Sequence, residues 1–345
     1  MFRLLALLQL TRAALAFTAI ADAWAVLLLR MPGAEAPPMW QLILLMAVTG
    51  IVSAGLYGFG MSLNDLLDAR RDRIFAPRRP IPSGRIPIRS AFVVSLLLLM
   101  GALFAAAALT PLHVVRVFLH QYPTLQDFIP WSFLFAFATA VLIVFYDATS
   151  KYLGGIGLLT LGTIRALHCL IGHPKTPLLF LSMFLLTHVV IISTISYKLE
   201  NKRPRLHRWD YVTIVAGLIL GNGLALTYMF LRGVFDFPVG GILIGLSSAA
   251  VVYAAWAVLQ FRNKSRSPRQ TGERLMLMGL FWLFVYDAAA LVANAQYLAG
   301  LAITLLLICA VISFFTIRFL SRMINQPKLG YRTQRTEHTA PPHPG

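Results

Sequence analysis

Several side chains that can bind metal or phosphate follow one long hydrophobic stretch of the chain. The segment from Asn64 to Ile86 reads NDLLDARRDRIFAPRRPIPSGRI. At about 100° per residue, a helix through its first part places four oxygen-bearing side chains within an arc of about 100°. These are Asn64, Asp65, Asp68 and Asp72. Mg²⁺ prefers such ligands and commonly shares its remaining positions with water and substrate phosphates. The four residues are therefore predicted to bind Mg²⁺ for a phosphate substrate.

A different interpretation is that these acids only form the solvated end of a helix, neutralised by Arg70, Arg71 and Arg73. Two observations favour a site. Three of only 13 acidic residues in the chain lie together here, and the following RRPIPSGRI contains the proline, serine and glycine residues that form turns. Such a loop exposes backbone donors, and arginine binds phosphate oxygens bidentately. The predicted phosphate-binding side chains are Arg78, Arg79 and Arg85.

This segment resembles the first aspartate-rich motif of the UbiA superfamily of intramembrane prenyltransferases, NDxxDxxxD followed by a loop similar to RPxPSGRI. The acids, Arg79-Pro80 and the run from Pro82 to Arg85 are all in register with that motif. One departure is Ala76, where many members carry an arginine. The resemblance implies a helical membrane enzyme that uses Mg²⁺ and a polyprenyl diphosphate.

Composition indicates a membrane protein independently of that motif. Of 345 residues, 58% are apolar and 12% charged, and the mean hydropathy is +0.73. A stretch of about 20 apolar residues is needed to span roughly 30 Å of hydrocarbon. Such stretches are found at 12–30, 40–63, 90–111, 129–146, 153–172, 177–197, 211–231, 239–261, 275–294 and 298–317. We therefore predict an all-α, polytopic transmembrane helical bundle of nine or ten spans, where UbiA-like proteins usually have nine.

The predicted membrane domain covers residues 1–323, and the polar residues 324–345 are expected to be a disordered cytoplasmic tail. Residues 12–30 are interpreted as a retained first span, because no small-residue cleavage site is suitably placed.

The distribution of basic residues predicts the orientation, because Lys and Arg accumulate in cytoplasmic loops. With the N-terminus in the cytoplasm, few basic residues fall on the opposite side: Arg30, Arg116, Lys175 and Arg232. The net charge of +17 is therefore explained mainly by the orientation of the protein in the membrane. It also favours contacts with anionic lipid headgroups. Because the charges are scattered over loops between spans, nucleic-acid binding is not expected. The expected location is the bacterial inner membrane.

A second group of polar residues, YDATSKY, lies at Tyr146 to Tyr152 on the same predicted side. Lys151 suits a diphosphate, and Asp147 could either join the metal ligands or pair with Lys151. The alternative is an ordinary interfacial pair of Tyr and Lys anchors. UbiA-like proteins have a similar Tyr and basic residue entering the fifth span, which favours substrate binding by Tyr146 and Lys151.

Arg165 lies near the middle of a predicted span, GGIGLLTLGTIRALHCLIG. An arginine inside a membrane is costly, so it generally faces the bundle interior and pairs with a partner. Asp22, Asp287 and an acid of the metal site are the candidate partners. Structural ion pairing and substrate binding both remain open at this point.

The sequence offers little support for other metal sites. His188 is expected to be a hydrogen-bonded packing residue rather than a ligand. Cys169 and Cys309 lie in apolar spans, where a lone cysteine usually packs as a small apolar residue. No CxxC or HExxH spacing indicates zinc.

The end of the sixth span departs from the resemblance. Most of the superfamily carries a second set of aspartates there, whereas this chain reads TISYKLENKRPR from Thr194 to Arg205. Glu200 is the acid left to hold metal, and Lys198 is expected to contact the diphosphate directly. This single-glutamate end, together with GTIRALHCLIG, looks similar to the EboC-type branch of UbiA-like proteins.

The predicted activity is Mg²⁺-dependent transfer of a prenyl group from a polyprenyl diphosphate to a lipophilic acceptor. The candidate catalytic residues are Asp65, Asp68, Asp72 and Lys151. The altered sixth-span end keeps open a membrane protein that binds or carries isoprenoids without turnover. A secondary transporter is a further alternative, because the intramembrane charges of Arg165, Asp22 and Asp287 would permit one.

Overall fold

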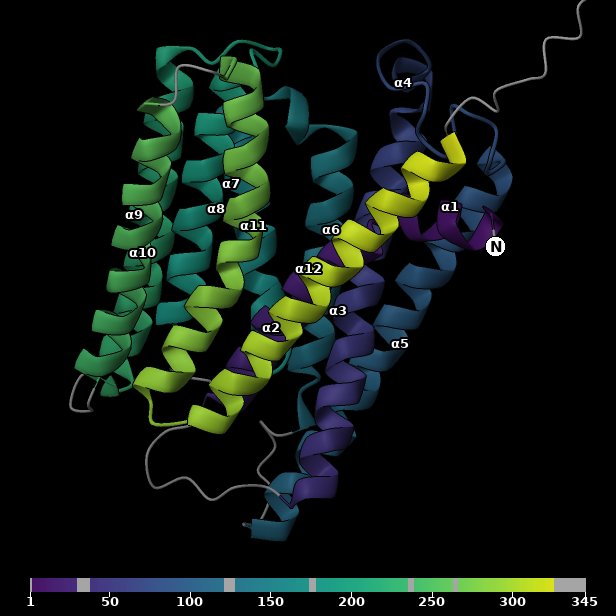
Figure 1. The fold of residues 1–345 in the computed structure, drawn as a ribbon. Coiled ribbons are helices and arrows are strands. Elements are labelled where there is room, and N and C mark those ends of the chain that lie inside the picture. Colours follow the sequence, from purple (N-terminus) through teal and green to yellow (C-terminus); the bar gives the residue numbers. More distant parts are fainter. Residues whose placement is uncertain are drawn as a thin grey trace, which may run out of the picture.

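The computed structural model describes residues 2–29, 38–120, 128–173, 178–234, 239–262 and 266–325. All regular elements in these ranges are helices (Figure 1). In chain order they are α1 (Phe2–Leu10), α2 (Ala13–Leu28), α3 (Met39–Leu67), α4 (Ala69–Phe75), α5 (Ile88–His120), α6 (Trp131–Ala148), the 3₁₀ turn η2 (Ser150–Tyr152), α7 (Gly155–Cys169), α8 (Phe180–Leu199), α9 (Arg208–Leu231), α10 (Val239–Arg262), α11 (Pro268–Ala293) and α12 (Tyr297–Asn325). The predicted all-α fold is confirmed.

The helices account for every predicted span. In the described part of the chain, eight are long and apolar enough to cross a membrane, namely α3, α5, α6 and α8 to α12. The pair α1 and α2, bent by 46°, qualifies together as a ninth, and α7 is apolar but only 15 residues long. Eight or nine candidate spans confirm the predicted polytopic helical bundle, whereas a tenth span would need the short helix α7, and the chain is a multi-pass membrane protein. The predicted tail, from residue 326 onward, lies outside the described residues.

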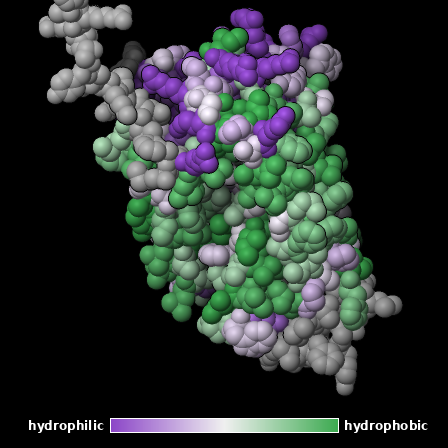
Figure 2. All heavy atoms as spheres, turned by 90° about the vertical axis from the view of Figure 1, so that its right-hand side faces the viewer, coloured by the Kyte–Doolittle hydropathy of each residue, from purple (hydrophilic) through white to green (hydrophobic). Residues whose placement is uncertain are grey.

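The two ends of the bundle differ in polarity. Figure 2 shows hydrophilic side chains gathered at one end, above a broad band of apolar surface. We call this the Asp-rich end, and define it as the end where α3 passes into α4. In Figure 1 it lies at the top, together with α1 and the C-terminal end of α12. Segments far apart in sequence therefore meet where the predicted site lies.

Helix α2 is the central helix of the bundle. It packs against α3, α7, α11 and α12. Alanines at positions 14, 16, 19, 21, 23 and 25 are all buried, and their small side chains let the neighbouring backbones approach closely. Interhelical packing of this kind replaces the hydrophobic driving force that is missing between helices in lipid. Helix α2 thus joins α3, α5 and α6 on one side to α8, α10 and α11 on the other.

Close packing of α3 on α5 supports the Asp-rich end. A Cβ atom at Gly55 would lie 2.9 Å from the Cβ atom of Ala102 and 3.0 Å from the carbonyl oxygen of Leu98. The glycine therefore allows the two helices to touch through their backbones. Because α3 carries Asp65 near its C-terminal end, this contact helps to set the height of the acidic segment relative to α5.

A buried ion pair ties α2 to α7 in the middle of the bundle. Arg165 Nε contacts Asp22 Oδ2, and Asp287 of α11 is close enough to interact electrostatically with both residues. Both aspartates are fully buried, with 0% exposure. Desolvated charges of this kind require a partner. The geometry therefore supports the structural alternative for Arg165, because no described contact joins its guanidinium to the acidic segment at the Asp-rich end.

His188 is a packing residue, as expected from the sequence. Its Nε2 atom lies 3.2 Å from the carbonyl oxygen of Gly279 and must carry the proton, because a carbonyl only accepts. Its Nδ1 atom therefore accepts from the hydroxyl of Tyr286 at 3.1 Å. Cys169 is buried, but Cys309 is exposed on α12, so the packing expectation for Cys309 was wrong. The reason is that Cys309 lies on the outward face of that helix.

Removing one partner of the buried pair is expected to destabilise the bundle. Arg165→Ala leaves Asp22 desolvated without a counter-charge, which costs about 3–5 kcal/mol. The double variant Arg165→Ala with Asp22→Ala should be more stable than Arg165→Ala alone. Thermal unfolding in detergent measures both, with Arg89→Ala at an exposed position as the control. A double variant no more stable than Arg165→Ala would contradict the pairing.

Candidate active site

The acidic segment lies where α3 ends and the short helix α4 begins. Helical hydrogen bonds continue across the junction, since Asp68 N donates to Asn64 O and Asp72 N donates to Asp68 O, both at 2.9 Å. The three aspartates are buried, with exposures of 3% for Asp65, 4% for Asp68 and 2% for Asp72. Buried carboxylates need counter-charges or donors, so the residues that supply these define the site.

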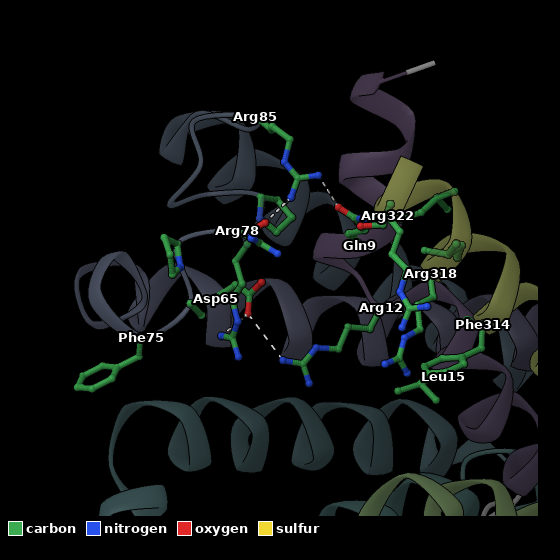
Figure 3. Close-up of a pocket in the computed structure, with 18 residues that line it drawn as sticks. Gln9, Arg12, Leu15, Asp65, Phe75, Arg78, Arg85, Phe314, Arg318 and Arg322 are labelled. Atoms are coloured by element: carbon green, nitrogen blue, oxygen red, sulfur yellow. Dashed lines mark hydrogen bonds and ion pairs between the residues drawn. The ribbon is translucent and has the colours of Figure 1, made fainter. Parts of the chain in front are cut away.

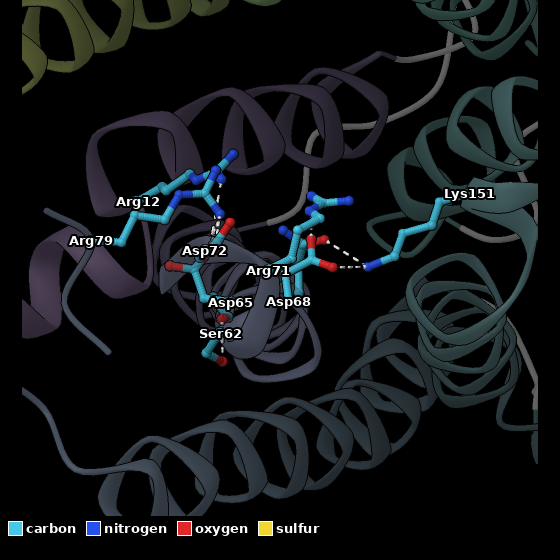
Figure 4. Close-up of polar contacts among 10 residues, drawn as sticks. Arg12, Ser62, Asp65, Asp68, Arg71, Asp72, Arg79 and Lys151 are labelled. Carbon is cyan, nitrogen blue, oxygen red and sulfur yellow. Dashed lines mark hydrogen bonds and ion pairs between the residues drawn. The ribbon is translucent and has the colours of Figure 1, made fainter. Parts of the chain in front are cut away.

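Arg79 neutralises two of the aspartates. Its Nη1 atom lies 3.2 Å from Asp65 Oδ1 and 2.6 Å from Asp72 Oδ2 (Figure 4). Arg12, at the bend between α1 and α2, adds a longer contact of 3.9 Å to Asp65 Oδ1. A charge-assisted hydrogen bond between guanidinium and carboxylate is roughly twice as strong as a neutral one. The loop that follows α4 is therefore held over the end of α3 by electrostatic attraction.

Asp68 belongs to a second cationic centre. Lys151 Nζ lies 3.0 Å from Asp68 Oδ1 and 3.4 Å from Asn64 Oδ1, and Arg71 contacts Asp68 Oδ2 at 2.9 Å. Lys151 is itself almost fully buried. Figure 4 shows Lys151 approaching from the side opposite to Arg79. The sequence predicted one face with all the acids, whereas in the structure they are divided between two cationic centres because the neighbouring cations come from different directions.

The loop after α4 is folded tightly on itself. Ser83 N donates to Arg79 O at 3.0 Å, and Ile86 N donates to Pro80 O at 3.1 Å. Gly84 has φ of +74°, in the left-handed region that favours glycine. The sequence predicted free backbone donors in this loop, but these two are used inside it. The turn residues thus serve to return Arg79 to the aspartates.

Arg85 fixes this loop to α1. Its Nη1 atom donates to Gln9 Oε1 at 2.7 Å, and its Nη2 atom donates to the carbonyl oxygen of Arg78 at 2.6 Å. Partial burial lowers the pKa of the Arg85 guanidinium, because the charged form loses solvent. Arginine nevertheless stays protonated in proteins. Both hydrogen bonds of the Arg85 side chain are thus made within the protein. The side chain of Arg78, in contrast, is exposed.

Asp210 of α9 fixes the position of Lys151. Its Oδ1 atom accepts from Gly155 N at 2.8 Å, and its Oδ2 atom accepts from His207 N at 2.7 Å. One carboxylate thereby caps the first turns of α7 and α9. Gly154 has φ of +53°, and a Cβ atom there would collide with Asp210. The start of α7, and with it the preceding turn η2 that carries Lys151, is held in place.

Sequence reasoning assigned neither Arg12 nor Asp210 to the site. Arg12 is only the first charge before an apolar stretch, and its contact with Asp65 depends on the bend between α1 and α2. Asp210 could have been recognised as a helix-capping residue, because it lies three positions after His207 at the start of a predicted span. Its contact with α7 depends on tertiary packing.

Tyr146 and Asp147 lie close to the second cationic centre. Tyr146 is half-buried near Asp68, and Asp147 is buried near both Lys151 and Asp68. The predicted convergence of YDATSKY with the acidic segment is therefore present in the structure. The functional roles of these two residues stay predictions.

The predicted contribution from the end of α8 lies apart from the aspartates. Glu200 forms an ion pair with Lys202, with 3.1 Å between Nζ and Oε2. Lys198 is exposed in the last turn of α8. No described hydrogen bond or ion pair connects Glu200 or Lys198 with the acidic segment. Their proposed roles therefore depend on a ligand that would lie between the end of α8 and the acidic segment.

The donor set at the Asp-rich end suits a divalent cation in type and charge. Among the described residues, no three Asp, Glu, His or Cys side chains converge closely enough to hold a metal ion. However, Arg79 already bonds to Asp65 and Asp72 together, so one positive centre bridges two buried carboxylates. A divalent cation in place of the guanidinium would keep these carboxylates neutralised. Carboxylate oxygens are the ligands that Mg²⁺ prefers.

Two adjoining cavities open beside the aspartates. The first, of about 1030 Å³, is formed by α1, α2, the end of α3, the loop after α4 and the last turns of α12 (Figure 3). The second, of about 750 Å³, lies among α2, α3, α5 and α12 and is mainly apolar. The two share Leu8, Ala14 and Ile317. Together they suit a ligand with a charged head and an apolar tail.

Comparison with known proteins identifies relatives over part of the chain. No protein-family model matches it. A digeranylgeranylglyceryl phosphate synthase of Metallosphaera sedula is 33% identical over 146 residues, which are 41% of this chain and 43% of that protein. The corresponding synthase of Sulfurisphaera tokodaii is 30% identical over 132 residues, 38% of this chain and 39% of that protein. The chain thus matches about two fifths of the length of these relatives.

The fold is also shared with a solved structure. A structure of digeranylgeranylglyceryl phosphate synthase aligns with a TM-score of 0.57, covering 86% of this chain and 100% of that chain, at 18% identity. The chain therefore shares its fold with that synthase.

Mg²⁺ is expected to restore part of the stability that is lost when the Arg79 guanidinium is removed. Arg79→Ala leaves Asp65 and Asp72 without their shared guanidinium, which lowers the melting temperature. Because Mg²⁺ can then neutralise both carboxylates, adding it should raise the melting temperature of Arg79→Ala more than that of the unaltered protein. Thermal unfolding with Mg²⁺ or with EDTA measures this difference. Arg73→Ala, at an exposed position of α4, is the control, and an equal response in all three proteins would exclude cation binding by these aspartates.

Proposed function

We propose that this protein transfers a prenyl group from a polyprenyl diphosphate to a lipophilic acceptor within the membrane, with Mg²⁺ as the cofactor. The observation that carries the proposal is the set of three buried, ion-paired aspartates, of which Asp65 lines a cavity with several arginines that adjoins a second, mainly apolar cavity. The names of the curated relatives support it, because those proteins are synthases of a lipid with geranylgeranyl chains.

The proposed metal ligands are the oxygen-bearing residues of the acidic segment, with a further one from α8. They are Asn64, Asp65, Asp68, Asp72 and Glu200. When bound, Mg²⁺ would neutralise charge on the diphosphate as the allylic C–O bond breaks. For Glu200 to take part, it must exchange its ion pair with Lys202.

The cations that now hold the aspartates would contact the diphosphate. Lys151 lies on one side of the acidic segment and Arg79 on the other, so both can transfer their hydrogen bonds from carboxylate to phosphate oxygens. Donors aimed at a developing negative charge contribute about 3 kcal/mol each in other enzymes. Arg78, Arg85, Tyr146 and Lys198 are proposed to bind substrate as well, whereas the ion pair of Arg165 indicates a structural role.

The apolar cavity would exclude water from the reaction. An allylic cation is formed when diphosphate leaves, and it must react with the acceptor before water reaches it. Among the residues that line the second cavity, Gly101 of α5 has nothing within 4 Å of the position that a Cβ atom would take, which leaves space for an isoprenoid chain. The chain would thus extend from the Asp-rich end toward the middle of the bundle.

The membrane orientation and location are part of this proposal. Basic residues gather at the Asp-rich end, which favours a cytoplasmic site and a cytoplasmic N-terminus in the bacterial inner membrane. The division at residue 323 and the EboC-type branch likewise stay predictions.

Diphosphate release from purified protein tests the proposal. With geranyl, farnesyl or geranylgeranyl diphosphate and a membrane lipid extract, we expect release that requires Mg²⁺. Asp68→Asn keeps the shape of the side chain but removes its charge, and should lower the rate about 100-fold, as expected for loss of one electrostatic contributor. Glu273→Gln, at an exposed acid of α11, is the matched control and should retain the rate.

Two results would contradict a prenyltransferase. Saturable binding of prenyl diphosphate without release would indicate an isoprenoid-binding protein. Absence of both binding and release would exclude a prenyl diphosphate substrate. Mg²⁺-independent movement of a solute across the membrane of vesicles that contain the protein would then favour a transporter.

A further inference from the structure

A third cavity lies on the other side of α2 from the two beside the aspartates (Figure 1). It has a volume of about 410 Å³, within the usual range of small-molecule sites. It is formed by side chains from residues 184–195 of α8 and 250–261 of α10, with Leu275 and Tyr286 of α11, and we call it the lateral cavity. In the described chain, no residue lines both this cavity and either of the first two. A ligand here would therefore be distinct from the substrates of the proposed transfer.

The lateral cavity is open toward the hydrocarbon of the membrane. All three helices that form it are long and apolar enough to be spans. Ile191, Val258 and Phe261 of its lining are about half exposed, at 46%, 49% and 49%. Apolar side chains that are exposed along a span face lipid rather than water. A ligand of the lateral cavity therefore enters from the bilayer and must be lipophilic.

The polar side chains that line the lateral cavity are uncharged. Among the described residues they are Thr187, His188, Tyr253 and Tyr286. His188 is neutral, because its Nδ1 atom accepts a hydrogen bond from the Tyr286 hydroxyl. A charged ligand in this place would lose its solvent without gaining a counter-charge. The ligand is therefore expected to be uncharged as well.

Three of these side chains form a compact cluster, which we call the tyrosine–histidine cluster: His188, Tyr253 and Tyr286. Both tyrosine rings stand edge to face on the imidazole, with centroid distances of 4.7 Å for Tyr253 and 5.1 Å for Tyr286. Gly279 of α11 makes room for them, since a Cβ atom there would lie 2.9 Å from Tyr253 Oη and 3.4 Å from His188 Nε2. The packing of three helices thus holds both phenol groups in fixed positions.

Every hydrogen on the polar atoms of the tyrosine–histidine cluster is already used within the protein. The Tyr253 hydroxyl donates to the carbonyl oxygen of Leu275 at 2.9 Å, and the Tyr286 hydroxyl donates to His188 Nδ1 at 3.1 Å. The remaining hydrogen, on His188 Nε2, points to the carbonyl oxygen of Gly279. A phenol oxygen that donates its one hydrogen can still accept. The cluster can therefore accept a hydrogen bond from a ligand but cannot donate one.

We propose that the lateral cavity binds an uncharged, lipophilic compound from the bilayer that carries a hydroxyl group. The hydroxyl donates to the phenol oxygen of Tyr253 or Tyr286. The lining of α8 extends from Phe184 to Ile195, about 16 Å at 1.5 Å per residue, so the apolar body of the ligand is elongated. This site does not rest on the proposed prenyl transfer, because it shares no residue with the acidic segment.

Matched pairs of ligands test the need for a hydroxyl. In para-octylanisole a methyl group replaces the hydroxyl hydrogen of para-octylphenol. Both can be titrated into the full-length protein in neutral detergent, without Mg²⁺ or prenyl diphosphate. We expect the phenol to bind at least about tenfold more tightly, because a site that hydrogen-bonds a ligand hydroxyl discriminates against the analogue that lacks it. Equal affinities for the phenol and the ether would overturn the proposal.

Decanol and its methyl ether form a second pair with an aliphatic body. A larger ratio of affinities for this pair than for the phenol pair would assign an aliphatic alcohol to the lateral cavity, and a smaller ratio would assign a phenol. Either result supports recognition of the hydroxyl. Ratios close to one for both pairs would contradict it.

The double variant Tyr253→Phe with Tyr286→Phe removes both phenol oxygens and keeps both rings. We expect it to bind para-octylphenol and para-octylanisole with nearly the same affinity. Tyr297→Phe, at an exposed position of α12, is the matched control and should keep the preference for the phenol. If the hydroxyls served only the packing of the helices, the double variant would have a lower melting temperature but an unchanged ratio of affinities, and the proposal would fail.

Two neighbouring alanines of α10 test the location of the ligand. Ala254 and Ala255 are both exposed, but only Ala254 belongs to the lining of the lateral cavity. Ala254→Leu fills part of the cavity and should weaken binding of para-octylphenol at least about tenfold, whereas Ala255→Leu should leave it unchanged. The same affinity in both variants would place the phenol elsewhere on the protein and overturn the assignment.

Discussion

Burial of Asp65, Asp68 and Asp72 is the constraint on which the Asp-rich end depends. Three carboxylates removed from water need positive partners, and these partners come from the loop after α4 and from η2. Arg79 and Lys151 therefore do more than balance charge. Through them the aspartates add electrostatic contacts to a loop that is otherwise held by the buried side chains of Ile81 and Ile86, and the shape of the first cavity follows from that arrangement.

The same pairs make the site responsive to an anionic ligand. A metal-bound diphosphate brings both a cation for the carboxylates and oxygens for Arg79 and Lys151, so every charge can exchange its partner without becoming unpaired. A protein with these aspartates exposed to water would gain less from that exchange, because water already solvates the charges. If the proposed diphosphate binds here, desolvation links the stability of the loop to its binding.

Helix α2 connects this polar end with the middle of the bundle. Arg12 precedes its first residue and contacts Asp65, while Asp22 lies further along the helix and pairs with Arg165. Between them, α2 packs through alanines against four other helices. The buried ion pair fixes α2 against α7, and α7 begins directly after the turn that carries Lys151. Helix α2 therefore helps to position both cationic centres of the site.

Residue types and local spacing were sufficient to predict the helical spans, the acidic segment and the nearby Lys151, because hydrophobic length and donor chemistry are properties of short segments. The division of the aspartates between two cations, the pairing of Arg165 with Asp22, and the roles of Arg12 and Asp210 were not predictable in this way. Lys151 and Asp68 are 83 positions apart, and Asp210 and Gly155 are 55 apart. Which of many arginines and acids meet was decided by the tertiary structure, because helix packing alone determines which distant side chains share a desolvated space.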